Sequence, residues 1–302
     1  MNSPRQTVSY LIQRFREVGL VPDARHGQNF LVDLNLVRLL ADAAAVGPDD
    51  VVLEVGTGTG SLTAMLAEQA GAVVTIEIDA HLHQLAAEVL IDFGNITMLQ
   101  QDALKNKNHF APELLQAVRQ QLAEQPGRQL KLAANLPYRI ATPVISNLLH
   151  FEPLPVSMTV TIQKELADRI TAAPRTKQYG ALSIWIQSQC DIEIVRILPP
   201  TVFWPRPQVD SAILQIRPVP EKRAQIPDPV FFHRFVRAMF FHRRKFLRSE
   251  LLSALKHRLD KPAVDQLMQQ QGLDGNARAE ELDVQAMLAL AEAVRQQVDE
   301  MP

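Results

Sequence analysis

VLEVGTGTG, residues 52–60, sets three glycines directly between an apolar run and a helical pattern. Gly56, Gly58 and Gly60 allow a tight backbone turn, and they let a ligand approach without meeting a Cβ atom. Alone the loop is a weak signal, because a glycine-rich turn between a strand and a helix can exist without a ligand. The stretch nevertheless indicates a strand, a tight loop and a helix in that order.

The same order of elements repeats on either side of this loop. Short apolar runs rich in β-branched residues are found at 51–55, 72–77, 95–100, 130–135 and 158–163. Helical patterns lie between them, near 61–70, 80–91, 110–124 and 142–150. This alternation is typical of a mostly parallel sheet with helices on both faces, whose strands read as continuous apolar runs. We therefore predict an α/β fold.

The later part of the chain departs from the alternation. Two strand-like runs, 192–198 and 209–217, have no helix between them, which suggests a hairpin and hence one antiparallel edge strand. The segment 179–189 is ambiguous by periodicity. Four prolines in 217–229 indicate a boundary, and only helical patterning follows it. A chain of 302 residues fits two domains, and we predict them at 1–219 and 220–302.

Acidic residues lie at or near the ends of three predicted strands. Glu77 lies 21 residues after Gly56, a position where a carboxylate can bind the ribose hydroxyls of an adenosine cofactor. Asp102, after the third strand, can accept from an adenine amino group or simply cap a helix. Both suit NAD and S-adenosylmethionine alike. The G-T-G-T-G loop lacks the spacing of the pyrophosphate fingerprint, and Glu54 would repel a pyrophosphate, so a cationic sulfonium cofactor fits better.

Asn135-Leu136-Pro137-Tyr138 ends the fourth run of the alternation. The exocyclic amine of adenine is a poor nucleophile because its lone pair is delocalised into the ring. The amide oxygen of Asn135 and the carbonyl of Leu136, both accepting from that amine, would favour attack. Pro137 removes a backbone donor and fixes the turn, and Tyr138 offers a face on which a flipped base can stack. The alternative is a strand-to-helix turn capped by Asn-x-Pro.

Composition and charge narrow the classes of function. The net charge of −2 hides a segment of +7 at 234–258 and one of −6 from 260 to the end. A row of cations spaced at helical intervals would hold RNA phosphates, although a solvated helix face is the ordinary alternative. The expected RNA-binding residues are Arg234, Arg237, Arg243, Arg244, Lys245 and Arg248. Their apolar counterparts on the same helical spacing are Phe232, Phe235, Met239, Leu247, Leu251 and Leu255.

Several classes are excluded at this point. A single cysteine, Cys190, allows neither an intrachain disulfide nor a cysteine metal cluster, and it favours a reducing compartment. No apolar run is long enough to cross a bilayer, and the N-terminal stretch lacks the apolar core of a signal peptide. No metal-ligand spacing or nucleophile triad is found. We expect a cytoplasmic protein without metal or membrane partner.

Many ordered motifs of the chain resemble the family of small-subunit ribosomal RNA adenine N6-dimethyltransferases. The matches are HGQNFLVD (26–33), VLEVGTGTGSLT (52–63), TIEID (75–79), QDAL (101–104), ANLPYRIATPVISNLL (134–149), QKELADRITAAP (163–174), YGALSIWIQ (179–187), FWPRPQVDSAI (203–213) and RRKFLRSEL (243–251). The resemblance implies a Rossmann-like class I methyltransferase sheet with a small all-α C-terminal domain for rRNA or ribosome recognition. It also implies a helix at 179–189.

The resemblance assigns roles to individual residues. It implies S-adenosylmethionine as cofactor, and two adjacent adenosines near the 3′ end of small-subunit rRNA as substrate, each methylated twice. Phe203 would form the wall of the base clamp opposite Tyr138, although a core-packing role is the alternative. The expected cofactor-binding residues are Gln28, Asn29, Leu31, Glu54, Gly56, Gly58, Gly60, Glu77, Ile78, Asp102, Ala103 and Asn135. The expected partner is an immature small ribosomal subunit, bound by a monomer.

Some positions depart from the family pattern. Thr57 stands where proline is common, and Gln101 where glycine often occurs. Arg139 and Ala141 replace the usual polar residues after the tetrapeptide, which bears on target entry. The spacer from Asp102 to Asn135 is 33 residues, longer than usual, and we expect an extended surface helix in it. None of these departures removes a group proposed for methyl transfer.

Three rival functions remain at this point. A large-subunit rRNA adenine methyltransferase of the antibiotic-resistance type is disfavoured by the extended C-terminal part and the NLPY form. A non-catalytic ribosome-assembly or transcription factor on the same fold is disfavoured by the intact tetrapeptide and acid pair. A nicotinamide oxidoreductase is disfavoured by the glycine spacing and by the lack of a catalytic His, Lys or Tyr constellation.

Overall fold

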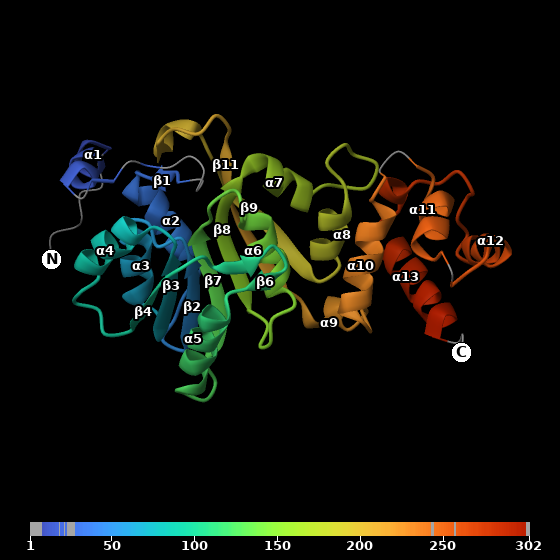
Figure 1. Ribbon diagram of the computed structural model, residues 1–302, viewed down its shortest axis with the longest axis horizontal. Coiled ribbons are helices and arrows are strands. Elements are labelled where there is room, and N and C mark those ends of the chain that lie inside the picture. Colours follow the sequence, from blue (N-terminus) through green and yellow to red (C-terminus); the bar gives the residue numbers. More distant parts are fainter. Residues whose placement is uncertain are drawn as a thin grey trace. The chain divides into compact units, whose positions relative to one another are not determined.

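The computed structural model describes residues 8–17, 19–20, 22, 28–242, 245–256 and 258–299 (Figure 1). The chain divides into two compact units, each with its own internal contacts. The first comprises Met1–Ala167 and Glu193–Arg217, and the second Asp168–Ile192 and Pro218–Pro302. The segment 168–192 thus belongs to the second unit, whereas the domains predicted from the sequence place it in the first.

The main sheet has seven strands in the order β4-β3-β2-β7-β8-β11-β9. The first five of these run parallel to one another. β2 and β3 are buried at all six positions, which explains why apolar residues predominate in them on both faces of the sheet. The bounds are β2 (Asp50–Val55), β3 (Ala72–Glu77), β4 (Ile96–Gln100), β7 (Gln129–Asn135), β8 (Ser157–Gln163), β9 (Cys190–Leu198) and β11 (Ser211–Pro218). The predicted α/β fold and its five parallel strands are confirmed.

The antiparallel strand is β11, which pairs with β8 from Ser211 opposite Gln163 to Ile216 opposite Met158. It does not lie at the edge of the sheet, because β9 continues the sheet beyond it. The predicted hairpin strands are therefore both present. The antiparallel strand is therefore next to the edge of the sheet, and not at the edge as expected.

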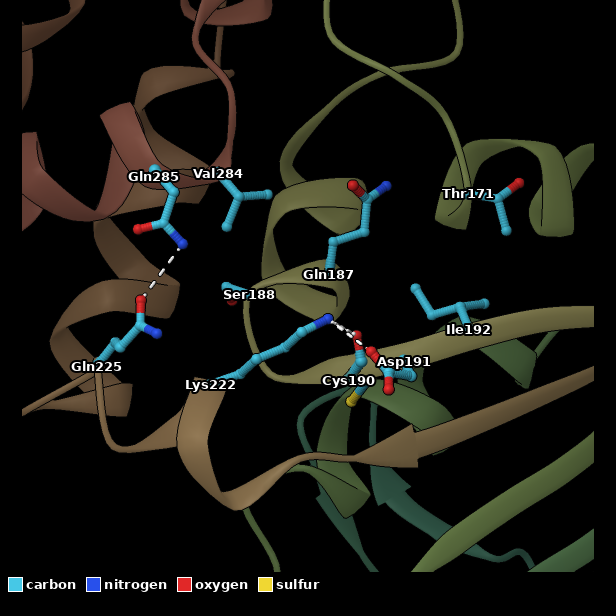
Figure 2. A pocket seen from close by; sticks show the side chains of 10 residues that line it. All are labelled: Thr171, Gln187, Ser188, Cys190, Asp191, Ile192, Lys222, Gln225, Val284 and Gln285. Atoms are coloured by element: carbon cyan, nitrogen blue, oxygen red, sulfur yellow. Dashed lines mark hydrogen bonds and ion pairs between the residues drawn. The ribbon is translucent and has the colours of Figure 1, made fainter.

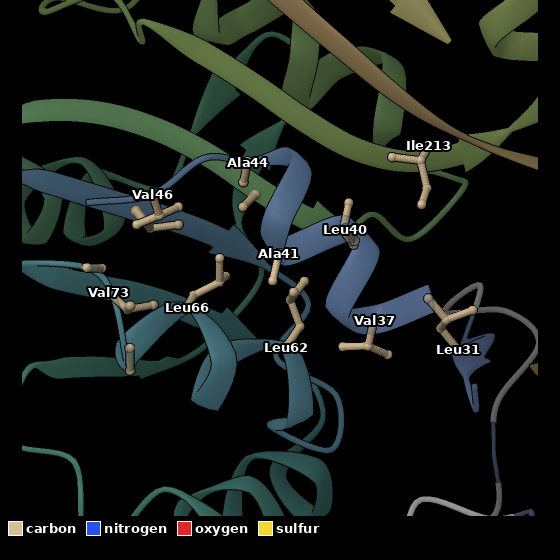
Figure 3. Packing of buried hydrophobic residues seen from close by; sticks show 14 of the residues in the cluster. Leu31, Val37, Leu40, Ala41, Ala44, Val46, Leu62, Leu66, Val73 and Ile213 are labelled. Carbon is tan, nitrogen blue, oxygen red and sulfur yellow. The ribbon is translucent and has the colours of Figure 1, made fainter. Parts of the chain in front are cut away.

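Helices pack against the sheet and bury one apolar face each. α2 and α3 meet through Val37, Leu40, Leu62 and Leu66, in a cluster that also includes Val73 of β3 (Figure 3). Removing these side chains from water is the main favourable term that holds the helices in place. The helices of this unit are α2 (Leu34–Ala43), α3 (Ser61–Ala67), α4 (Ala80–Val89), α5 (Pro112–Ala123) and α6 (Ala141–Leu148).

The spacer before the NLPY tetrapeptide does not form an extended surface helix. It contains two short antiparallel strands, β5 (Leu104–Asn106) and β6 (His109–Phe110), and then α5. α5 buries Leu114 and Val118 and contacts β2 and β3, so it is a covering helix of the sheet. The spacer is long because it holds a small hairpin as well as this helix.

An N-terminal helix and two short strands brace the region of the glycine loop. α1 (Val8–Glu17) contributes Phe15, whose ring centroid lies 5.1 Å from that of Phe30 and 5.5 Å from that of Trp204. β1 (Phe30–Leu31) pairs antiparallel with β10 (Phe203–Trp204). The stretch after Gln28 is therefore tied to a segment about 170 residues later in the sequence.

The second unit is mainly helical. Its helices are α8 (Ala181–Gln187), α9 (Pro220–Arg223), α10 (Pro229–Met239), α11 (Leu247–Ala254), α12 (Lys261–Gln270) and α13 (Val284–Asp299). α8 confirms the helix that the family resemblance implied at 179–189. The six predicted apolar positions of 231–258 are all buried. No helix in the described ranges is long and apolar enough to cross a membrane.

Candidate active site

The glycine loop follows β2 with three residues in the left-handed region of the backbone. Gly56 has φ +89°, Gly58 +56° and Gly60 +79°, conformations that side chains rarely adopt. The amide of Gly56 donates to the carbonyl of Ile76 at 2.9 Å, which fixes the loop to the end of β3. The conformational reason for glycine that the sequence suggested is thus present at all three positions.

Gly56 also faces the proline of the NLPY tetrapeptide. A Cβ atom at position 56 would lie 3.3 Å from two ring carbons of Pro137, tighter than ordinary contact. The loop and the tetrapeptide are therefore packed against each other, although about 80 residues separate them in sequence. This is the junction that a cofactor-dependent transfer requires, because the donor and the target must meet.

Glu77 lies at the end of β3 and holds the glycine loop. Its Oε2 accepts from the amide of Gly58 at 2.9 Å, and its Oε1 accepts from that of Asp79 at 3.1 Å. Burial raises the pKa of Glu77, and the two backbone donors oppose that rise. A carboxylate can accept up to about four hydrogen bonds, so these two leave capacity for ribose hydroxyls.

Glu54 lies deeper, inside β2, and is only 1% exposed. The hydroxyls of Thr63 and Thr75 donate to its Oε2 at 2.6 and 2.7 Å. Thr57, the departure from the family's proline, is joined to Thr75 by a 2.6 Å hydroxyl contact. Burial raises the pKa of Glu54 to about 8, against the effect of the two hydroxyls. The hydrogen bonds of this carboxyl group thus link β2 to α3 and to β3 next to the glycine loop.

A cavity of about 540 Å³ opens beside the loop, within the size range of small-molecule sites. Ile78, which is 45% exposed, presents an apolar surface of the kind that the flat face of an adenine ring needs. Asp102 uses its Oδ1 to accept from the amide of Leu104 at 2.9 Å, in a turn into β5 instead of a helix cap. The expected residues that line the cavity are Gly56, Glu77, Ile78, Asp102, Ala103 and Pro137.

A second, smaller cavity of about 50 Å³ also borders the glycine loop. It is lined by five of the expected cofactor residues, namely Leu31, Glu54, Gly56, Gly58 and Asn135. Gln28 lies near this part of the chain, and its amide donates to Asp79 Oδ2 at 3.4 Å. The two cavities share Gly56, so one extended ligand could occupy both.

Asn135 is the last residue of β7, and its side chain is held by the N-terminal stretch. Its Nδ2 donates to the carbonyl of Asn29 at 3.0 Å, which leaves the amide oxygen as its acceptor for another molecule. The amide of Leu136 donates to the carbonyl of Thr161 at 3.1 Å and so fixes the peptide that follows Asn135. Asn29 therefore acts here through its backbone oxygen.

Tyr138 is half-buried, and its hydroxyl lies 2.6 Å from that of Ser211 on β11. Burial raises the pKa of Tyr138, so the phenol stays neutral. Phe203 is only 3% exposed and packs in the cluster that includes Leu31 and Ile213. The ring would have to leave this cluster to stack on a base, so its role in the clamp stays a prediction.

The predicted basic row does not lie on one continuous helix. Arg234 and Arg237 are exposed on α10, but residues 240–246 separate this helix from α11. Lys245 is exposed in that connection. Arg248 forms an ion pair with Asp265, with Nη2 to Oδ2 at 2.9 Å. Arg243 and Arg244 lie outside the described residues.

Residues that were not predicted as cofactor contacts also line the larger cavity, although Arg139 was singled out as a departure that bears on target entry. Lys105, Asn106 and Lys107 come from β5 and the turn after it, and Arg139, Ile140 and Pro143 follow the tetrapeptide. The available signal was their position directly after Asp102 and Tyr138. Ser211 was not predicted as a site residue either, although it lies within the quoted FWPRPQVDSAI stretch (203–213).

A further cavity of about 400 Å³ in the second unit does not have the chemistry of an active site (Figure 2). The ammonium of Lys222 donates to the carbonyl of Cys190 at 2.9 Å and to Asp191 Oδ1 at 2.8 Å, so its charge is compensated (Figure 2). Burial raises the pKa of the Cys190 thiol to about 12, so it is not a nucleophile. The described residues contain no cluster of metal-ligating side chains.

Comparison with known proteins places this geometry among RNA-modifying enzymes. The family model described as ribosomal RNA adenine dimethylase matches residues 23–296. Proteins named ribosomal RNA small subunit methyltransferase A, from Bacillus thuringiensis and Bacillus cereus, are each 39% identical over 270 residues, which is 89% of this chain and 89% of theirs.

Solved structures share the architecture. A dimethyladenosine transferase from Plasmodium falciparum has a TM-score of 0.73 at 23% identity, over 88% of this chain and 97% of that one. The 23S rRNA methyltransferase ErmE has a TM-score of 0.61 at 25% identity, over 88% of this chain and 100% of that one. The sheet with its covering helices is therefore a known methyltransferase fold.

Proposed function

The chain belongs to the ribosomal RNA adenine dimethylase family, and from that premise we propose that it methylates N6 of two adjacent adenosines near the 3′ end of small-subunit rRNA. S-adenosylmethionine is the methyl donor of this family. The proposal extends to an immature small subunit as the bound form of the substrate, to a monomeric enzyme and to the cytoplasm as its location. Relatives at 39% identity that are named for the small subunit favour this substrate over large-subunit rRNA.

The residues present fit S-adenosylmethionine. The left-handed glycines form a cradle that a Cβ atom would fill, with 3.3 Å to Pro137 at position 56. Glu77 and Asp102 would hold the ribose and the adenine amine, and Ile78 would cover the base. The carboxylates of Glu77 and Asp102 would repel a pyrophosphate placed beside them, whereas a cofactor without phosphate meets no such repulsion from these two residues. When bound, this cofactor supplies an electrophilic methyl group on a sulfonium centre.

The chain's own residues position and activate the acceptor amine. The Asn135 amide oxygen and the Leu136 carbonyl would accept its two hydrogens and so draw nitrogen towards tetrahedral geometry. The ring of Tyr138, tethered through Ser211, would stack on the base. No general base is required, because the methylated ammonium is acidic and releases its proton to water. Positioning of this kind supplies much of the rate.

A single observation carries the proposal: the packing of Gly56 against Pro137, together with the hydrogen bond from Asn135 to the Asn29 carbonyl. Three segments that are far apart in sequence meet there, namely the N-terminal stretch, the glycine loop and the tetrapeptide. Asn135 lines the smaller cavity and Pro137 the larger one, and Gly56 lines both, which supports a position of the Asn135 side chain close to a bound cofactor.

The test is methyl transfer from labelled S-adenosylmethionine to undermethylated small subunits, with naked rRNA of both subunits as comparison, followed by mapping of the modified adenines. We expect label in small-subunit rRNA only. Asn135→Ala should lower kcat by at least about a hundredfold, since it removes an acceptor used in the transition state. Asn35→Ala, an exposed amide on α2, is the control and should keep full activity. Absence of label in small-subunit rRNA, or an active Asn135→Ala, would overturn the proposal.

A further inference from the structure

Three cations stand around the larger cavity of the first unit. Lys105 and Lys107 come from β5 and its turn, and Arg139 follows Tyr138 directly; all three line the same space of about 540 Å³ as Glu77 and Asp102. Each of them is exposed to solvent. The cavity therefore has an acidic wall and a basic rim, and the rim is defined here as Lys105, Lys107 and Arg139.

The backbone that carries the rim is held in place from several sides. The amide of Leu104 is bound by Asp102 Oδ1 at 2.9 Å, and Asn106 Oδ1 accepts from the amide of Asn108 at 2.9 Å. β5 pairs with β6, and the amide of Ala111 donates to the Ala103 carbonyl at 2.9 Å. The hairpin is thus an ordered support, and the cations on it are placed at the opening before any substrate arrives.

Arg139 is fixed on the opposite side by the turn after the tetrapeptide. The amide of Ile140 donates to the carbonyl of Pro137 at 3.0 Å, and α6 begins at Ala141. The guanidinium therefore extends from a backbone that is set by the catalytic segment itself. Any group that binds Arg139 is held close to Asn135 and Tyr138, because Arg139 lies four residues after Asn135 and directly after Tyr138 in the sequence.

The cofactor does not account for this charge. Its adenosine part carries no phosphate, and its cationic sulfonium centre would be repelled by further cations. Internal neutralisation does not account for the charge of the two lysines either, since neither Lys105 nor Lys107 forms a salt bridge within the described residues. The remaining partner for these two ammonium groups is an anion that comes with the substrate, and Arg139 lines the same cavity. The substrate of the proposed function carries one phosphate per nucleotide, and phosphate contacts position a nucleic acid without reading its sequence.

We propose that the basic rim binds the phosphates that flank the target adenosine and so sets which nucleotide reaches Asn135. The inference rests on the proposed function for the identity of the RNA. A single-stranded or splayed segment suits the rim better than a duplex, because the target base must leave its stack to reach the amide oxygen. The rim would thus hold the backbone while the tetrapeptide holds the base.

The experiment compares Lys105→Gln, Lys107→Gln and Arg139→Gln, singly and combined, with the wild-type chain. The measurements are KM and kcat for small-subunit rRNA, the dissociation constant for RNA over a salt series, and the dissociation constant for S-adenosylmethionine. The matched control is Arg196→Gln, an exposed cation of the same unit on β9, at the other end of the strand order from β3 and β4.

We expect the triple variant to raise KM for RNA about 30-fold at moderate salt, with cofactor affinity unchanged. The slope of log affinity against log salt should fall by about 2, since each single-strand phosphate contact contributes about 0.7. Arg139→Lys should retain most of the affinity, because it keeps the charge. The control should match the wild type in every measurement.

Two results would contradict the proposed role of the basic rim. One is an unchanged KM and salt slope in the triple variant, and the other is a loss of cofactor affinity that parallels the loss of RNA affinity. Failure of the proposed function is separate, because it is read from the wild-type chain alone as the absence of label at N6. If the wild-type chain methylates N6 and the triple variant is unaffected, the proposed role of the rim is wrong and the proposed function is retained.

Discussion

The cofactor side of the first unit and the basic region of the second unit are built in opposite ways. Around the glycine loop, Glu54 and Glu77 are buried and bound by two donors each from the protein itself. On α10, Arg234 and Arg237 are exposed and extend into solvent. The first region is organised before its ligand binds, whereas the second presents charge that an RNA can use without a fixed geometry.

This difference determines what a substitution should do. A change in the organised region removes a shape, so its effect should be large and confined to cofactor binding and stability. A change in the exposed region removes one charge among several, so its effect should be small and dependent on salt. Four substitutions test the contrast, and the Gly56 variant should have the largest effect.

Gly56→Ala attacks the organised region at its tightest point. Alanine would have to adopt φ +89° and place its Cβ 3.3 Å from the Pro137 ring. A strained non-glycine backbone costs about 1–3 kcal/mol, and the shift of the loop away from Pro137 adds to it. We expect cofactor affinity to fall at least about a hundredfold, measured by isothermal titration calorimetry.

Gly94→Ala is the control for this experiment, since a Cβ there meets no atom within 4 Å and its φ is not in the left-handed region. It should bind the cofactor as the wild type does. If Gly56→Ala binds normally, the loop is less constrained than its geometry indicates, and the contrast between the two regions fails at its strongest point.

Glu54→Gln tests the buried carboxyl group through pH. Because burial raises the pKa of Glu54 from the ordinary 4.5 to about 8, the folded state holds one more proton than the unfolded state between these values. Wild-type stability should therefore fall as pH rises from about 5 to 8, by at most of the order of 4 kcal/mol from this group. Glutamine imitates the protonated form and should remove that part of the fall.

The measurement is the free energy of unfolding from urea titrations between pH 5 and 9. Glu77, whose pKa is raised in the same direction, is present in both proteins and cancels from the difference between them. Parallel curves for wild type and variant would show that Glu54 is ionised in the folded state. The hydroxyls of Thr63 and Thr75 would then suffice to hold the charge.

Much of the first region could be predicted from sequence, because its physical constraints are local. Strands buried on both faces are rich in apolar residues, so the predicted strand 72–77 is observed as β3 with the same bounds. Left-handed turns need glycine, so Gly56, Gly58 and Gly60 identify the loop. The family assignment is confirmed by the 39% identity of relatives, and it was carried by motifs from these same segments.

What the sequence could not provide depends on contacts between distant segments. The β5–β6 hairpin has strands of two or three residues, too short for any periodicity, so it was not predicted within the spacer that was expected to hold an extended surface helix. The spacing of apolar residues runs on through 240–246 as if the helix continued, although α10 ends at Met239. β11 lies one strand inside the edge of the sheet because β9 occupies the edge beside it. The predicted hairpin does not by itself specify which of its two strands takes the edge.

The smallest expected effects come from a pair of arginines in the basic region, and they sharpen the comparison within it. Arg237 is exposed on α10, whereas Arg248 has both a charge partner and a short contact in Asp265. Arg237→Gln should weaken RNA binding a few-fold and lower the salt slope by about 0.7 to 0.9. Arg248→Gln should change RNA binding less, because its charge is already compensated, and should leave thermal stability almost unchanged, because exposed ion pairs contribute little. Filter binding over a salt series and thermal unfolding measure the two quantities. Equal losses of RNA affinity in both variants would mean that RNA displaces Asp265 from Arg248, and that the basic region is organised by its ligand instead of by its own contacts.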